Sequence, residues 1–472
     1  MRIALSRVAA IGALVSIAAF GAPSTVVLPN SSDLAALTQF LGQMPKGGDI
    51  HHHYSGAMYT ETYLDWAKRN GMQIDPQSLM LVKSATTTSI TIDSLTRNSA
   101  LLRKVMETWS DMDYRNHYED QQAPDEKFFG TFGYFGAISN TYMPDGLQEI
   151  KSRAVQENVE YIETMLKSVG YYMPDSVFDA QLDSLRIRRD SAGLDRALNT
   201  FFGKVNSDAK FRPAYTKFMK LADSIHLGID DSNFTMRFQT YVSRTASASV
   251  VYSGLIAAFN ASSYDSLIVG VNIVGAENDF VAMRDEWLHV RMFQFLHKRF
   301  FPKVHIAMHA GELALGMVKP EDLAYHINDA VLVSHTERVG HGVDLPHERS
   351  PQALLDTMKA RKTCVEINLT SNEFILGVAG KAHPIDLYRK AGVKIALSTD
   401  DPGVSRNNLT DEYVLLVSRY GLSYQEVKDI AGNSIDCSFL SDASKKRLNA
   451  QLDARFTAFE AKVKAGKIVS LW

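Results

Sequence analysis

The sequence predicts an α/β fold, a TIM-type (β/α)₈ barrel with helical insertions over its C-terminal face. Eight short apolar runs rich in β-branched residues recur along the chain, and amphipathic helical stretches separate them. Strands that alternate with helices form a parallel sheet, and eight such units close into a barrel. Histidines and carboxylates directly follow several of these runs, which is where a barrel of this kind places its active site.

The strands are predicted from the positions of these runs. Their bounds are Asp49–His53, Val159–Leu166, Thr235–Ser243, Ser266–Val274, Lys303–His309, Glu337–Gly340, Thr363–Asn368 and Lys394–Ser398. The chain has 472 residues, and a barrel with insertions reaches this length as one domain. We therefore expect a single domain over residues 23–472.

The first residues have the pattern of an export signal. Arg2 and Arg7 form a short positive segment, residues 8–20 are uncharged and largely apolar, and small residues follow. This pattern is typical of a secretory signal peptide, and the apolar run is short for a membrane-spanning helix. We predict a signal peptide at residues 1–22, with a membrane anchor as the alternative, and an exported mature protein that has no membrane span and lies in the periplasm or the medium.

Composition narrows the classes of partner. The chain is 45% hydrophobic and 22% charged, its formal net charge is −3, and it contains no run of more than three basic residues. Binding to a nucleic-acid backbone is therefore not expected. The sequence leaves the oligomeric state open, with a homodimer among the options.

Two cysteines occur, Cys364 and Cys437, and Cys364 lies within the apolar run KTCVEINL. Buried free thiols are the default prediction. A disulfide, which export would permit, is the alternative.

Two intervals between predicted strands are longer than a barrel repeat needs. The interval Tyr59–Gln156 is rich in helical patterns and places Phe128, Phe132 and Phe135 on one helical face. Such a stripe indicates core packing, although a helix over the barrel mouth could serve core and ligand together. The interval at about 175–231 is charged and helical in pattern, and we predict an inserted helical subdomain on the C-terminal face.

The segment MPKGGDIHHHYSGA places His51 and His53 two residues apart at the end of a strand. Alternate residues of a strand point to the same face, so these two imidazoles converge while His52 points away. Two converging histidines are half of a zinc site. Three consecutive histidines also occur in solvated turns. The remainder of the chain therefore decides between a zinc site and a solvated turn.

Two further strand ends carry histidines. In KVHIAMHAGE, His309 ends a strand and Glu312 follows a glycine that permits a sharp turn. His309 taken alone would be assigned a structural function, and His305, which shares its parity but lies deeper, is assigned to packing. In ERVGHGVDL, His341 lies between two glycines, which favours close backbone approach and therefore a site.

The segment VKIALSTDDPGV ends a strand with Asp400 and Asp401. Adjacent carboxylates are costly at an apolar strand end unless a cation or a shared proton is present, whereas in a solvated loop they would cap a helix. Convergence of three histidines on the same rim favours the cation. The resulting set, which suits one Zn²⁺ per chain with a bound water, is His51, His53, His309 and Asp400.

Three polar residues are then left for acid, base and orienting functions, namely Glu312, His341 and Asp401. In such a site zinc lowers the pKa of water, a basic group takes its proton, and hydroxide attacks an electron-poor carbon.

The motifs HHH, HAGE, GHG and STDDP, in this order, resemble the adenosine deaminase family of zinc-dependent (β/α)₈ hydrolases. A fifth segment, GVNIVGAEND, resembles the family's strand end that contains a glycine and an acidic residue. The resemblance spans roughly residues 44–403. The signal peptide, the opening MPKG and the charged insertion resemble the exported, growth-factor-related branch of the family.

The resemblance implies specific functions for the matching residues. The four predicted ligands match the metal ligands of the family. Glu312 matches the residue that protonates purine N1 as hydroxide adds to C6, and His341 matches the group that orients the water and helps to deprotonate it. Asp401 matches the carboxylate that contacts the hydroxide and N7, and Gly275 matches the glycine whose N–H meets N3. Ammonia then leaves and the ring becomes a 6-oxopurine.

Two positions depart from the family pattern. Ser55 stands where the cytoplasmic family usually has an aspartate that contacts the ribose, so a hydroxyl without charge is left for sugar binding. Asn272 stands where a carboxylate is common and is assigned a supporting function.

The leading prediction is an exported, zinc-dependent deaminase that converts adenosine or deoxyadenosine to inosine or deoxyinosine. The alternatives are a deaminase of another 6-aminopurine (adenine, a 5′-modified adenosine or an adenine nucleotide) and a nucleoside-binding or signalling protein without turnover. A degenerate enzyme is expected to have lost a ligand or the acid, and none is missing from this sequence.

Overall fold

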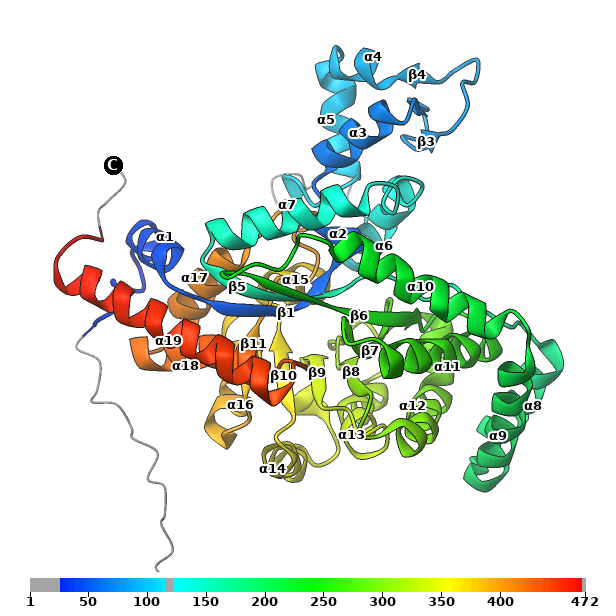
Figure 1. The fold of residues 1–472 in the computed structure, drawn as a ribbon. Coiled ribbons are helices and arrows are strands. Elements are labelled where there is room, and N and C mark those ends of the chain that lie inside the picture. The colour runs from blue at the N-terminus through cyan, green and yellow to red at the C-terminus, as the bar shows by residue number, and fades with distance from the viewer. Residues whose placement is uncertain (1–25, 115–121, 469–472) are drawn as a thin grey trace, which may run out of the picture.

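The computed structural model describes residues 26–114 and 122–468 (Figure 1). The predicted signal peptide at residues 1–22 lies outside the described residues. Eight parallel strands form one sheet in the order β1-β5-β6-β7-β8-β9-β10-β11, which confirms the barrel. The strands are β1 (Gly47–His53), β5 (Val159–Met165), β6 (Thr235–Ser243), β7 (Ile268–Val274), β8 (His305–Ala310), β9 (Arg338–His341), β10 (Cys364–Ile367) and β11 (Ile395–Leu397).

The barrel closes where the end of β1 meets the residues that follow β11. The backbone N–H of Asp400 donates to the carbonyl oxygen of His51 at 2.9 Å, and the N–H of His53 donates to the carbonyl oxygen of Asp400 at 2.8 Å. His52 and Asp400 form the corresponding bridge. The residues that close the barrel are therefore the same ones that the sequence assigns to the metal site.

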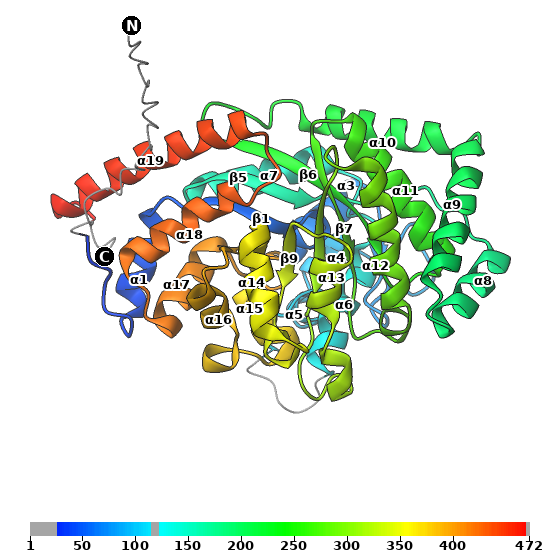
Figure 2. The same ribbon diagram turned by 90° about the horizontal axis from the view of Figure 1, so that it is seen from below.

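Helices surround the barrel, as the view from below shows (Figure 2). Helices α1 and α19 pack against α17 and α18 respectively. These helices are α1 (Leu34–Gln43), α7 (Met143–Gln156), α10 (Phe211–His226), α11 (Ala248–Tyr264), α12 (Phe280–Phe300), α13 (His326–Leu332), α14 (Pro351–Arg361), α15 (Leu369–Leu376), α16 (Ile385–Ala391), α17 (Leu409–Tyr420), α18 (Tyr424–Asp436) and α19 (Asp442–Lys464). Single 3₁₀ turns lie at η2 (Pro320–Leu323), η3 (Leu345–His347) and η4 (Gly380–Ala382).

The interval between β1 and β5 is helical, as predicted, and also forms a small antiparallel sheet. Its helices are α2 (Tyr54–Ala57), α3 (Thr60–Arg69), α4 (Ile92–Thr96), α5 (Ser99–Thr108) and α6 (Pro124–Phe135). The sheet has the order β3-β2-β4 and comprises β2 (Gln73–Ile74), β3 (Leu81–Val82) and β4 (Ile90–Thr91). Strands of two residues carry no readable periodicity, and the sequence did not predict them. The sheet stands out from the barrel with α4 and α5 (Figure 1).

The aromatic stripe of α6 is part of the core. Phe128 and Phe135 are buried, and Phe132 is half-buried. Phe135 stacks on Tyr63 of α3 with ring centroids 4.6 Å apart, and Phe128 lies near Phe374 of α15. The stripe therefore joins two separate helices of the molecule.

The predicted insertion at 175–231 forms α8 (Ser176–Ile187), α9 (Ser191–Ser207) and α10. Helices α8 and α9 pack against α11 and α12, along the outside of the barrel (Figure 2). Helix α11 is buried on all its faces, as expected for a helix whose apolar residues are not confined to one stripe. The insertion therefore covers an apolar surface that a bare barrel would leave exposed.

The prediction of free cysteines is wrong, because Cys364 and Cys437 form a disulfide. Cys364 begins β10 and Cys437 caps the C-terminus of α18, and their Cα atoms are 6.1 Å apart. Helix α18 packs against β11, the neighbour of β10. This return of the chain over 73 residues brings the thiols together, and the burial of Cys364 alone does not reveal it.

We expect Cys437→Ser to lower the free energy of unfolding by about 2–5 kcal/mol, because the disulfide restricts a long loop in the unfolded chain. Denaturant unfolding under non-reducing conditions measures the loss. A reductant is expected to bring the wild-type protein to the stability of the variant and to leave the variant unchanged. Finding both cysteines as free thiols in the unreduced, denatured protein would contradict the assignment.

Candidate active site

The four predicted metal ligands meet at the C-terminal ends of three strands. His51 and His53 come from β1, His309 comes from β8, and Asp400 comes from the segment that follows β11. Their ligand atoms all lie within 4.8 Å of one another. All four side chains are buried. The prediction from strand parity is confirmed, because His52 points away and contacts Thr164 instead.

The donor atoms of this set lie close enough to share one bound zinc ion. His53 Nε2 is 3.1 Å from His309 Nε2 and 3.3 Å from Asp400 Oδ1, and His51 Nε2 is 3.5 Å from the same oxygen. Two donors that each bond one zinc ion at about 2.0–2.1 Å lie at most roughly 4.2 Å apart. The spacing of the donors therefore matches the ion that the sequence predicts.

The protonation of the histidines also fits a cation. Burial lowers the pKa of His53 to about 4 and that of His309 well below its ordinary value, so both rings present neutral nitrogen lone pairs, as metal ligands must. Burial opposes protonation of His51 too, but its hydrogen bonds with Asp400 and Glu366 raise its pKa to about 10. Two carboxylates thus hold a positive charge at His51, and a metal ion can supply that charge in place of the proton.

A connected set of buried side chains supports two of the ligands from behind. His51 Nδ1 contacts Glu366 Oε2 at 2.5 Å, and Arg338 Nε contacts the other oxygen of Glu366 at 2.5 Å. Arg338 Nη2 also donates to Glu163 Oε1 at 2.6 Å. Outer hydrogen-bond partners of this kind fix the orientation of metal-binding histidines.

A second series of hydrogen bonds connects Glu163 to His309. Gln239 Nε2 donates to Glu163 Oε1 at 3.0 Å, and Asn272 Nδ2 donates to Gln239 Oε1 at 3.1 Å. Asn272 Oδ1 then accepts from His309 Nδ1 at 3.0 Å. The supporting function predicted for Asn272 is therefore a contact with a metal ligand, made by an amide where the family commonly has a carboxylate.

Strained backbone marks the same rim. His341 has φ of 68° and Asp400 has φ of 65°, both in the left-handed region that residues other than glycine rarely adopt. Such strain persists where surrounding contacts over-determine the conformation, and it gathers at functional sites. Gly56 lies against the Asp401 carboxylate so closely that a Cβ there would be 1.7 Å from Oδ1.

The predicted acid and its neighbours face this metal set. Glu312 Oε1 lies 3.5 Å from His341 Nε2, and the backbone N–H of Glu312 donates to Glu277 Oε2 at 2.7 Å. Burial, together with Asp400 and Glu277, raises the pKa of Glu312 well above its ordinary value. The surroundings of Glu312 therefore favour its protonated form, which is able to donate.

Asp401, the other predicted carboxylate, is also buried. Its Oδ1 has no hydrogen-bond partner among residues 26–114 and 122–468. Burial and the adjacent Asp400 raise the pKa of Asp401 well above its ordinary value.

Gly275 and Ser55, the other residues predicted to bind substrate, follow β7 and β1, which are not neighbours in the sheet. Gly275 follows β7 directly and has φ of 97°, a conformation that favours glycine. Ser55 lies in α2, where its carbonyl oxygen accepts from the hydroxyl of Tyr63 at 2.6 Å. Burial raises the pKa of Tyr241 to about 12, and the neighbouring Ser55 side chain opposes that rise. Hydroxyl groups are therefore gathered where the family usually has an aspartate.

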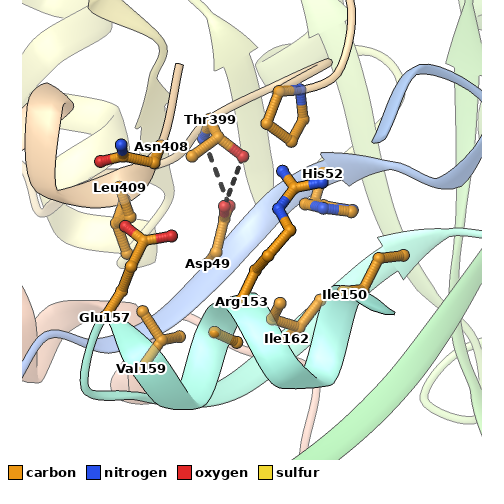
Figure 3. A pocket seen from close by; sticks show the side chains of 12 residues that line it. Asp49, His52, Ile150, Arg153, Glu157, Val159, Ile162, Thr399, Asn408 and Leu409 are labelled. Carbon is orange, nitrogen blue, oxygen red and sulfur yellow. Dashed lines mark hydrogen bonds between the residues drawn. The ribbon is translucent and has the colours of Figure 1, made fainter. Parts of the chain in front are cut away.

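A small cavity lies on the other side of β1 (Figure 3). Its volume is about 20 Å³, room for about one water molecule. The carboxylate of Asp49 accepts from the hydroxyl of Thr399 at 2.6 Å in this cavity, and His52 lines it. Asp49 thereby ties the strand that carries His51 to the residue that precedes Asp400.

Fold and site together define a (β/α)₈ barrel protein with a buried group of three histidines and one aspartate whose spacing can hold a metal ion. The family model described as adenosine deaminase matches residues 215–455, about half of the chain. The chain belongs to the adenosine deaminase family.

Curated relatives agree with this assignment over part of the chain. Adenosine deaminases from several strains of Escherichia coli are 32% identical over 152 residues, which make up 32% of this chain and 42% of the relative. The match thus spans less than half the length of these relatives.

Solved structures share the fold over nearly the whole chain. Arabidopsis ADAL complexed with IMP has a TM-score of 0.59 at 18% identity, covering 89% of this chain and 99% of that one. Adenine deaminase from Arthrobacter aurescens has a TM-score of 0.54 at 17% identity, with coverage of 87% and 98%. An amidohydrolase from Burkholderia ambifaria with bound Zn has a TM-score of 0.55 at 16% identity, with coverage of 91% and 95%. At these identities the likeness concerns the fold.

Several polar residues of the site were not singled out from the sequence. They include Glu163, Gln239, Glu277, Glu366, Asn372 and His383, all of them buried. Glu163, Gln239 and Glu366 each interrupt an apolar strand, and a polar residue inside such a run was the available signal. Glu277 lies in the segment GVNIVGAEND, which the family resemblance had indicated, whereas nothing local marks Asn372 and His383.

We expect His53→Asn to lose most of the bound zinc, because the substitution removes one ligand of a four-ligand set. The matched variant His52→Asn alters the adjacent histidine, which points away from the set, and is expected to keep one zinc per chain. Metal content of the purified variants, measured by mass spectrometry, decides the point. Equal zinc loss in both variants would contradict the assignment of ligands.

Proposed function

We propose that this protein is a zinc-dependent deaminase of 6-aminopurine nucleosides, with adenosine and deoxyadenosine as its substrates. The observation that carries the proposal is the buried acid Glu312, held beside a complete three-histidine, one-aspartate set. When bound by this set, Zn²⁺ supplies a Lewis acid that makes water acidic enough to attack at neutral pH. The overall reaction adds water to the aminopurine and releases ammonia and a 6-oxopurine.

The chain's own residues provide proton transfer and orientation. Glu312 is protonated, so it donates its proton to purine N1 as the oxygen adds to C6. The N–H of Glu312 bonds to Glu277, which fixes the turn that carries the acid. Asp401 has an unpartnered carboxylate oxygen among the described residues, and we assign it the contacts with the attacking oxygen and N7. We assign the N–H of Gly275 to N3 and the Ser55 hydroxyl to the sugar.

Burial of the site favours this chemistry. Glu312, Asp400 and Asp401 are each at most 6% exposed, so water competes little with the transferred proton. A carboxylic acid kept neutral by burial is the form that can donate a hydrogen bond or a proton near pH 7.

We expect Glu312→Gln to keep its zinc and lose about 10²–10⁴-fold in kcat, because glutamine holds the same shape without an acidic proton. Loss of the ultraviolet absorbance of adenosine measures turnover, and metal analysis measures zinc. If the zinc-loaded variant turns over adenosine as fast as the wild-type protein, the assigned acid is wrong. If the zinc-loaded wild-type protein leaves adenosine unchanged, the proposed substrate is wrong.

A second substrate class follows from Ser55. Without a carboxylate at this position, the contact with the sugar lacks a charged group. The alternative substrates are therefore adenine, a 5′-modified adenosine or an adenine nucleotide. The fold neighbours include one protein named as an adenine deaminase and one crystallised with IMP. Comparing kcat/KM over a panel of 6-aminopurines distinguishes these from adenosine, and a strong preference for unmodified adenosine would exclude them.

We also propose that the protein is exported to the periplasm or the medium. The charged and apolar pattern of residues 1–22 supports this, as does the disulfide, since disulfides persist in oxidising compartments. In the part of the chain that the structure describes, no helix is long and apolar enough to cross a membrane. Mature protein that begins near Ala22 in the exported fraction is expected, whereas full-length, reduced protein in the cytoplasm would contradict export.

A further inference from the structure

His341 is held from behind by side-chain amides. Its Nδ1 lies 2.8 Å from Asn372 Nδ2 and 3.4 Å from Asn368 Nδ2. Its other ring nitrogen, Nε2, faces Glu312 Oε1 at 3.5 Å. Which of the two ring nitrogens carries the proton determines whether His341 offers the site a donor or an acceptor.

The proton's position follows from a hydrogen-bond chain that starts at a backbone group. The N–H of Ile385 donates to His383 Nδ1 at 3.2 Å. A backbone N–H can only donate, so His383 Nδ1 is an acceptor and carries no proton. Burial lowers the pKa of His383 to about 4, so the ring is neutral and its single proton lies on Nε2.

The next step fixes the amide of Asn372. His383 Nε2 lies 3.0 Å from Asn372 Oδ1, and its N–H donates to this oxygen. The amide nitrogen of Asn372 is thereby directed at His341 Nδ1, as a donor. Asn372 and His383 are both buried, at 0% and 3% exposure, so water does not compete for these bonds.

The last step fixes His341 itself. Its Nδ1 accepts from Asn372, so in the neutral ring the proton lies on Nε2, the nitrogen that faces Glu312. A ring nitrogen that accepts a hydrogen bond carries no proton, so the bond from Asn372 leaves His341 in a neutral form.

We propose that Asn372 and His383 are positioning residues that lock His341 in its neutral, Nε2-protonated tautomer. In this state His341 donates a hydrogen bond to the oxygen that adds to the purine. It does not remove the proton of water, as the family resemblance had suggested. Its use in catalysis rests on the proposed function, whereas the tautomer does not.

The tautomer of His341 determines which residues donate and which accept protons in the site. A donor at His341 stabilises negative charge as it develops on the attacking oxygen, which is the arrangement that electrostatic catalysis requires. The proton of the water must then pass to a group other than His341. Asp401, whose Oδ1 has no hydrogen-bond partner among the described residues, can accept it only in its ionised form, which a bound cation favours. Glu312, as the protonated acid, remains the donor to the ring.

Ring-nitrogen NMR of the zinc-loaded protein tests the tautomer directly. With ¹⁵N-labelled histidine, and the His341 signals assigned by their loss in His341→Asn, we expect Nε2 in the protonated range and Nδ1 in the unprotonated range. Asn372→Asp keeps the shape but can only accept, so it is expected to move the proton to Nδ1. A protonated Nδ1 in the wild-type protein, or unchanged signals in Asn372→Asp, would overturn the proposal.

Kinetics of paired variants separate positioning from packing. His383→Gln keeps an N–H that can donate to Asn372, whereas His383→Leu removes it. We expect kcat to fall about tenfold or more in His383→Leu, with KM little changed and zinc retained, and to stay near wild type in His383→Gln. Asn372→Asp is expected to lose about 10²-fold in kcat. Equal kcat in the Leu and Gln variants would overturn the proposal.

His289→Leu is the matched control. His289 is fully buried, and its ring nitrogens have no hydrogen-bond partner among the described residues. The substitution makes the same chemical change in the interior and is expected to leave kcat unchanged. Because the NMR readout needs no turnover, a protein inactive on every 6-aminopurine would refute the proposed function and leave the tautomer result standing.

Discussion

The pair of backbone hydrogen bonds between β1 and Asp400 is the contact on which the remainder of the structure depends. It closes the barrel, and it also places two histidines of β1 beside the aspartate that follows β11. A parallel sheet of eight strands could close in other registers, and each shift by one residue would turn His51 and His53 away from the rim. Asp49 reinforces the register through Thr399, immediately before Asp400.

Placing so many charges in a closed interior requires compensation, and Arg338 supplies much of it. Its guanidinium lies between Glu163 and Glu366, and the ring of Phe439 is 3.8 Å from its central carbon. The removal of one partner from such a buried group typically costs about 3–5 kcal/mol, because it leaves an unpaired charge. The same arginine links the supports of His51 and His309, so stability of the barrel interior and geometry of the metal site are coupled.

The fold could be predicted from the sequence because its signals are local. Each of the eight apolar runs became a strand, and the parity of His51 and His53 placed the ligands on one face. The disulfide could not be predicted, because it depends on how the end of α18 packs near β10 in the folded chain. The support of His341 by Asn372 and His383 was equally out of reach, because it arises only when α15 and the segment before α16 fold together.

The motifs indicated which residues react but not how each is held. His341 was predicted to help to remove a proton from water, yet a bond from the Ile385 backbone, transmitted through two side chains, directs an N–H into the site instead. Local patterns of residue type indicate which side chains are able to react. The direction of each hydrogen bond is set by neighbours that are distant in sequence.

Anomalous diffraction at the zinc edge, from crystals of the protein with a non-hydrolysable 6-aminopurine nucleoside analogue, tests the central claim most directly. We predict one strong peak coordinated by His51, His53, His309 and Asp400, with the Glu312 carboxyl group within hydrogen-bond distance of purine N1. A site without zinc at these residues, or a purine bound away from Glu312, would contradict the account.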